Sequence, residues 1–181
     1  MIDRTSVEFS AATGSTYSHV DVATPAALDA SQRVASVLAW LARCADKSEL
    51  DIGFGVETDS AGLWAAQVPW RASIDFTRGL SALAAQCTAH NQELQKRGSH
   101  LRDLVARRPE LRARARQRDP RVLPLALLIV DRIDDAHAEA GSELTIALTR
   151  DGAASRWLFD ANKLSAAQVA QLQQQWLALS Q

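Results

Sequence analysis

An almost unbroken apolar run at residues 123–130, LPLALLIV, constrains the fold of this chain more than any other feature. The run has the length of one strand, and a strand without polar alternation is typical of the centre of a sheet that is covered on both faces. Segments 52–56 and 144–148 show instead the alternation of strands with one buried face. Helical patterns separate these segments, so the sequence predicts an α/β domain with a single mixed sheet and flanking helices.

Two turns are expected to join neighbouring strands into hairpins. Residues 59–62 (DSAG) link the first alternating strand to a second strand within 63–74, where Pro69 favours an edge position or a bulge because proline has no N–H to donate. Asp-Gly at 151–152 turns the other alternating strand back towards residues 157–159. Each hairpin would place its two strands side by side in the sheet.

The first two helices are predicted from capping signals and apolar stripes. Thr24-Pro25 offers an N-cap and a first-turn proline for a helix that runs to about Ala45. Thr77 is expected to cap a longer helix, which Gly98-Ser99 interrupts. The apolar stripes of these helices are predicted to be buried: Val34, Val37, Leu38, Leu41, Leu80, Leu83, Ala84, Cys87 and Leu94.

The last helix has the clearest signals in the chain. Ser165 and Gln168 form the Ser-x-x-Gln pattern of a capping box. The predicted buried stripe consists of Val169, Leu172, Trp176 and Leu179. Glutamines between these positions are expected to be exposed and to offer rim residues to a partner: Gln171, Gln173, Gln174 and Gln175.

The length of the chain is that of one domain, and its net charge is close to zero. The 181 residues fit a single domain over 1–181, in which we expect 1–16 to be irregular and 17–22 either to continue this segment or to form a short strand. The 20 basic and 21 acidic side chains nearly cancel, which argues against nucleic acid or an anionic membrane as a partner. The first residues lack a signal-peptide pattern and no apolar stretch has membrane-spanning length, so we expect a cytoplasmic protein, and the abundant alanine and arginine indicate a bacterial one.

No combination of nucleophiles, bases or metal ligands in the sequence predicts catalysis. The chain has four scattered histidines: His19, His90, His100 and His137. None stands at metal-ligand spacing with a cysteine or a carboxylate. Cys87 and His90 are three residues apart, but their helix face is apolar and offers no third group to orient the histidine. We therefore expect no catalytic residue, metal, cofactor or small-molecule substrate, and both Cys44 and Cys87 as reduced, buried thiols.

Two concentrations of charge remain. Residues 102–121 hold eight arginines, including four at alternate positions: Arg112, Arg114, Arg116 and Arg118. Alternation by two distributes them around a helix, and no aromatic residue interleaves to stack on bases, so we expect them at the rim of a protein interface and not on nucleic acid. The acidic residues after the central run lack the pattern of a calcium loop and are expected in a solvated connection: Asp131, Asp134, Asp135 and Glu139.

Taken in order, the predicted elements resemble the C-terminal lobe of a condensation domain of nonribosomal peptide synthetases, a member of the chloramphenicol acetyltransferase-like superfamily. The resemblance covers about residues 17–181. It rests on five segments that match the family in type and order: 38–59, 67–86, 123–131, 143–165 and 166–179. It implies a mixed α/β lobe whose neighbour in a synthetase is an adenylation domain.

Two departures from the family pattern bear on activity. The family's motif of two adjacent histidines, followed three residues later by Asp-Gly, has no counterpart because no two histidines are adjacent in this chain. Only the short stretch 59–63 (DSAGL) stands where relatives carry an arginine and a longer connection towards the other lobe. We therefore expect a truncated, noncatalytic lobe that acts as a structural platform for an adjacent adenylation domain.

Two other interpretations stay open at the level of sequence. One is half of a split condensation enzyme, completed by an N-terminal lobe on another chain. The other is a generic partner-binding α/β protein unrelated to synthetases, whose sheet order would differ from that of the family.

Overall fold

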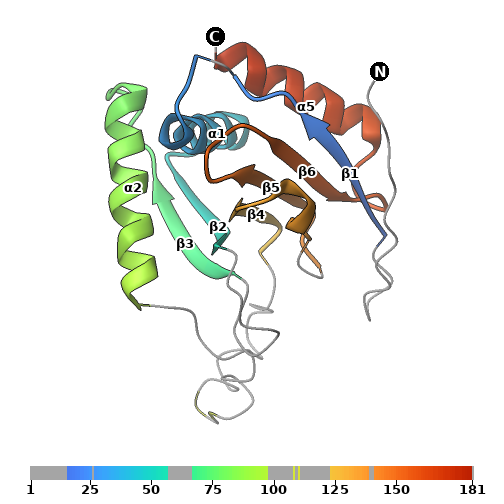
Figure 1. Cartoon of the computed structure of the whole chain (residues 1–181), viewed down its shortest axis with the longest axis horizontal. Coiled ribbons are helices and arrows are strands. Elements are labelled where there is room, and N and C mark those ends of the chain that lie inside the picture. The colour runs from blue at the N-terminus through green and yellow to red at the C-terminus, as the bar shows by residue number, and fades with distance from the viewer. Residues whose placement is uncertain are drawn as a thin grey trace.

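The computed structural model describes residues 16–25, 27–56, 67–97, 108, 110, 123–138 and 141–180. In chain order, the elements are β1 (Tyr17–Val22), α1 (Ala30–Ala45), β2 (Glu49–Val56), β3 (Val68–Ser73), α2 (Leu80–Arg97), β4 (Leu125–Val130), the short 3₁₀ helix η1 (Ile133–Asp135), β5 (Leu144–Thr149), β6 (Ser155–Asp160) and α5 (Ala166–Leu179). The described strands form one sheet in the order β1-β6-β5-β4-β2-β3 (Figure 1).

The apolar run forms β4, which lies between β2 and β5 and runs parallel to both. Antiparallel pairs add β3 next to β2, β6 next to β5, and β1 at the far edge. The predicted central strand, the second hairpin, the pairing of the first two hairpin strands and the edge position of Pro69 are therefore confirmed, whereas the turn predicted at 59–62 lies outside the described residues. The fold class is also confirmed, since the sheet is mixed and helices flank it.

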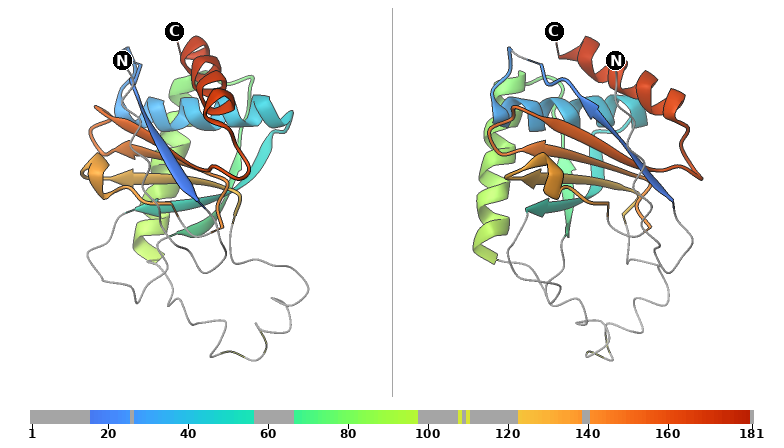
Figure 2. Two further views of the ribbon diagram at one scale, coloured as in Figure 1. Left: turned by 90° about the vertical axis from the view of Figure 1, so that its right-hand side faces the viewer. Right: turned by 45° about the vertical axis from the view of Figure 1, so that its right-hand side comes forward.

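Among the described residues, helices α1, α2 and α5 lie on one face of the sheet (Figure 2). Helix α1 lies in the middle, in contact with both α2 and α5. Beneath α1 and α5, the rings of Trp40, Trp157 and Trp176 pack in series with centroid distances of 5.3 and 5.9 Å. On the opposite face, residues 133–138 pack on a smaller apolar cluster: Leu128, Val130, Ala147 and Leu158.

Strand β1, at the beginning of the described chain, pairs with a strand from its last third. It pairs with β6, so that Tyr17 lies opposite Asp160 and Val22 opposite Ser155. The guanidinium of Arg156 binds both carboxylate oxygens of Asp21, at 2.6 and 3.0 Å. The strand expected at 17–22 is thus confirmed, and of the segment expected to be irregular, 1–16, the described residues include Thr16 alone.

The first helix starts later than predicted. Its N-cap is Asp29, which forms a capping box with Gln32 and so satisfies two backbone N–H groups at once. Thr24 instead donates its hydroxyl proton to the carbonyl of Ala153 at 3.3 Å. The carbonyl of Pro25 accepts bonds of 3.0 and 2.9 Å from the side chain of Arg33, so the predicted capping segment is a turn held by the helix and not part of it.

The other helices need smaller corrections. Thr77 belongs to a turn before α2, and the carbonyl of Gly79 accepts the first helical bonds from Ala82 and Leu83. The capping box of Ser165 and Gln168 is confirmed for α5.

Three burial predictions were wrong. On α5, Leu179 was predicted to be buried but is 49% exposed, and Gln173 was predicted to be exposed but is buried. Cys44 is also exposed, because it stands in the last turn of α1, and Cys87 is buried as predicted.

Candidate functional site

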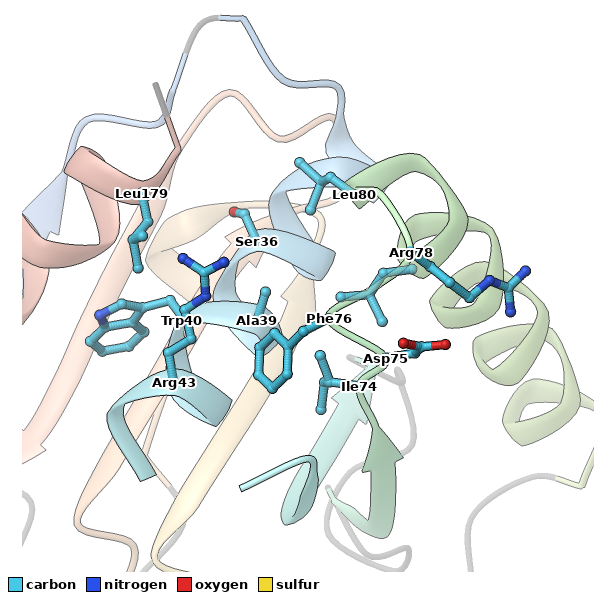
Figure 3. A pocket seen from close by; sticks show the side chains of 11 residues that line it. Ser36, Ala39, Trp40, Arg43, Ile74, Asp75, Phe76, Arg78, Leu80 and Leu179 are labelled. Atoms are coloured by element: carbon cyan, nitrogen blue, oxygen red, sulfur yellow. The ribbon is translucent and has the colours of Figure 1, made fainter. Parts of the chain in front are cut away.

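Two large apolar side chains are strongly exposed in the described part of the chain, and they line the same hollow. Phe76 is 47% exposed and Leu179 is 49% exposed. Both belong to a groove of about 170 Å³ between α1, the C-terminal end of α5, the β3–α2 loop and the first turn of α2. Figure 3 shows Leu179 on one side of this groove and Phe76 on the other, with Ala39 and Arg43 of α1 between them.

A tight turn places Phe76 at the groove. The preceding residue Ile74 is buried, and its N–H donates to the carbonyl of Ser48 at 2.7 Å. The carboxylate of Asp75 accepts bonds from the backbone N–H of Thr77 at 2.9 Å and from its hydroxyl at 2.7 Å. These two bonds lower the pKa of Asp75 and leave Phe76, between the two residues, projecting from the turn.

The floor of the groove is rigid because it belongs to the core. Ser36, Ala39, Trp40 and Arg43 stand at helical spacing on one face of α1. Trp40 is fully buried against Trp157, while the hydroxyl of Ser36 accepts a 3.0 Å bond from the indole N–H of Trp176 and donates a 2.8 Å bond to the carbonyl of Arg33. An incoming group therefore meets a preformed surface.

The charge at the groove is basic. The guanidinium carbon of Arg43 lies 5.7 Å from the centroid of the Phe76 ring, within cation–π distance. Arg78 stands at the rim and extends outward (Figure 3). Neither arginine has a carboxylate of the described residues within ion-pair distance, but the charge of Arg78 contributes to the lowered pKa of Asp75, whose carboxylate also accepts two bonds from Thr77.

A second hollow of about 190 Å³ lies at the carboxyl ends of β2 and β4, beside the first turn of α1. Its arginine, Arg150, is already paired with Asp131 at 2.7 Å. The polar groups of Thr88 and Thr149 in its wall bond to the backbone carbonyls of Ala84 and Ala154. Arg150, Thr88 and Thr149 of this hollow are therefore occupied, whereas Arg43 of the groove forms no ion pair with a described carboxylate.

The residues proposed from sequence as interaction sites lie elsewhere. Arg112, Arg114, Arg116 and Arg118 fall outside the described residues. Gln171, Gln174 and Gln175 are exposed on α5 as predicted, but none lines the groove. The sequence reasoning missed Arg43, Phe76 and Arg78 altogether, because the signal for the groove lies in the packing of three distant segments.

The groups weighed for catalysis have structural roles where the structure describes them. Burial raises the pKa of the Cys87 thiol to about 12, so the sulfur stays protonated and is no nucleophile near neutral pH. The ring of His90 stacks on Trp70 at 4.8 Å. Within the described ranges, no three His, Cys, Asp or Glu side chains are placed to hold a metal ion.

The acidic residues after β4 form surface ion pairs. Asp131 pairs with Arg150 at 2.7 Å, Asp134 with Arg156 at 3.4 Å, and Asp135 with Arg132 at 4.0 Å. Glu139 lies outside the described residues. The expected solvated connection is thus found for the three aspartates.

No family model and no curated protein matches this sequence, but solved structures match its fold. The starter condensation domain of rhizomide synthetase RzmA has a TM-score of 0.58 and 16% sequence identity, over 91% of this chain and 43% of that chain. The first condensation domain of the CDA synthetase has a TM-score of 0.56 and 13% identity, over 83% of this chain and 37% of that chain.

The chain has the fold of one lobe of a condensation domain. It spans less than half the length of the two structures just described. The resemblance predicted from sequence is confirmed at the level of the fold. In the described ranges, none of the helices combines the length and hydropathy that crossing a bilayer requires.

Proposed function

We propose that this chain is a noncatalytic condensation-like lobe of a cytoplasmic nonribosomal peptide synthetase and serves as a docking platform for an adjacent adenylation domain. The observation that carries the proposal is the groove, where Phe76 and Leu179 expose apolar surface above a rigid floor. Exposed apolar side chains around a pocket are characteristic of protein interaction sites. The sequence supports the noncatalytic part, since no two histidines are adjacent in it.

The test uses the adenylation domain encoded with this chain, expressed with and without it. We expect the lobe to raise the melting temperature of that domain and to bind it in solution, and Leu179→Ser to weaken the binding. The Ala170→Ser variant, on an exposed position of α5 outside the groove, is the control for a serine in this helix. Unchanged melting temperature and amino-acid activation, together with no chemical-shift change on mixing the two proteins, would contradict the proposal.

A split condensation enzyme is the second candidate. It is favoured by one observation, that the chain covers 43% of a starter condensation domain and so corresponds to one part of that enzyme. The two candidates differ in a single assay: a separately expressed lobe with the adjacent-histidine motif is mixed with this chain and with loaded carrier proteins. Condensation product above the level given by either lobe alone supports the split enzyme and excludes the noncatalytic platform.

A further inference from the structure

We propose that the groove between α1, α5 and the β3–α2 loop receives an acidic amphipathic helix of the neighbouring domain. One large apolar side chain of that helix enters between Phe76 and Leu179, and a carboxylate pairs with Arg43. This inference rests on the proposed function, because it names the part of the partner that would occupy the docking surface.

The size of the groove favours an anchoring side chain over a small-molecule ligand. Pockets for drug-sized ligands have volumes of about 300–1,000 Å³, whereas this groove has about 170 Å³. The lining is apolar at Leu80 and Leu83, and Ala39 and the buried Trp40 belong to the floor. Such a site suits one anchor residue of a protein interface, surrounded by weaker contacts.

The charge of the groove selects an acidic partner. Arg43 stands between Phe76 and Leu179, and Arg78 adds a second positive charge at the rim (Figure 3). Thr77 donates both of its bonds to one oxygen of the Asp75 carboxylate, whose negative charge acts on Arg78, whereas the Arg43 guanidinium meets a ring face and no described carboxylate. An incoming carboxylate would therefore find Arg43 without an ion-pair partner among the described residues, and the two arginines outweigh the single carboxylate of Asp75 in the lining, so an acidic partner is favoured over a basic one.

A helix supplies the required side chains in the right arrangement. Residues at i, i+3 and i+4 of a helix lie on one face, so apolar anchors form a row with acidic residues along its border. The groove has α1 as its floor, with Leu179 at the end of α5 on one side and the β3–α2 loop on the other, so a third helix can lay a ridge of side chains along it.

The probe is a synthetic blocked helix of about 18 residues, long enough to be helical in water, with leucines along one face and glutamates elsewhere. A second peptide replaces every glutamate by glutamine. Binding to the full chain is followed by chemical shifts at low and high salt. We expect the acidic peptide to bind and to weaken with salt, and the neutral peptide to bind less tightly.

Variants locate the site. Arg43→Gln is expected to weaken binding of the acidic peptide about two- to fivefold, the usual effect of an exposed ion pair. Leu179→Ser is expected to weaken it about tenfold, as for an anchor contact. Arg132→Gln removes the same charge from the opposite face of the sheet, and should change nothing.

Three outcomes would overturn the inference. The acidic peptide does not bind, or the neutral peptide binds as tightly as the acidic one, or the Arg43→Gln and Leu179→Ser variants bind the acidic peptide as tightly as the unchanged protein does. The proposed function can fail separately. If the adenylation domain does not bind while the acidic peptide does, the platform proposal is wrong and the groove assignment stands. If the adenylation domain binds through Leu179 and the peptide does not, the acidic helix is wrong.

Discussion

Helix α5 takes part in two regions, a buried core and an exposed groove, that differ in solvent exposure although they are less than one turn apart. Trp176 is fully buried, packs on Trp157 and donates its indole N–H to Ser36. Leu179, three residues later, is half exposed over the groove. The tryptophan core, Trp40, Trp157 and Trp176, packs α1 and α5 on the sheet. The same two helices also line the groove, but the exposed side chains there contribute little to the stability of the fold.

The comparison teaches that stability and recognition are separable here. Removing a ring from the tryptophan core leaves a cavity, and removing a side chain from the groove exposes little that was covered before. Four predictions test this separation, from the largest expected effect to the smallest.

Trp176→Ala is expected to lower the free energy of unfolding by about 3–5 kcal/mol, because it removes a buried ring and leaves a cavity between α5 and β6. Urea unfolding followed by circular dichroism measures the change. A loss below about 1 kcal/mol would mean that α5 is not docked through this ring.

Ser36→Ala tests the boundary between the two regions, since Ser36 bonds to Trp176 and also lines the groove. The variant leaves the buried indole N–H without its acceptor, which is expected to cost about 1–3 kcal/mol. Ser81→Ala on the exposed side of α2 is the control for replacing a helical serine. Equal unfolding midpoints for the two variants would show that the Trp176 bond contributes nothing.

Leu179→Ser is expected to change the free energy of unfolding by less than about 0.5 kcal/mol, as surface substitutions usually do. The same urea titration measures it. A larger loss would place Leu179 in the core after all, and the comparison between the two ends of α5 would then fail.

Thr77→Ala is expected to raise the pKa of Asp75 towards its ordinary value, because it removes the hydroxyl bond that contributes most to the lowered pKa. A lowered native pKa means that the native state binds the proton more weakly than the unfolded chain. The turn's contribution to stability is therefore present above the ordinary aspartate pKa and is lost as the pH falls through the lowered value. NMR titration of Asp75 in both proteins measures this, and an unchanged pKa would contradict the assigned bond.

The elements with local signals were predictable from sequence. The run at 123–130 became β4 because an unbroken apolar strand has to be covered on both faces. Asp-Gly at 151–152 became the β5–β6 turn, where Gly152 has a φ of 73°. Ser165 and Gln168 capped α5 through contacts within one turn of chain. In each case the deciding interaction lies within a few residues.

The errors arose where distant residues decide the outcome. Thr24-Pro25 is a valid capping signal, but Asp29 has a full capping box and Arg33 holds the earlier turn by bonding to Pro25 and to Gly152. Leu179 continues the apolar spacing of α5, yet nothing from the sheet covers it at the helix end. The groove is assembled from three segments distant in the sequence, so no local pattern could reveal it.

The pairing of β1 with β6 has a consequence for how the chain folds while it is being synthesised. Asp21 and Arg156, which bind each other across this pair, are 135 residues apart. At a synthesis rate of about 5–20 residues per second, β1 waits roughly 7–27 s for its partner. During that interval it is an unpaired strand, and an exposed strand edge invites association with other chains. The polar Ser18, His19 and Asp21 along this strand make it a poor template for such association while the partner is still being made.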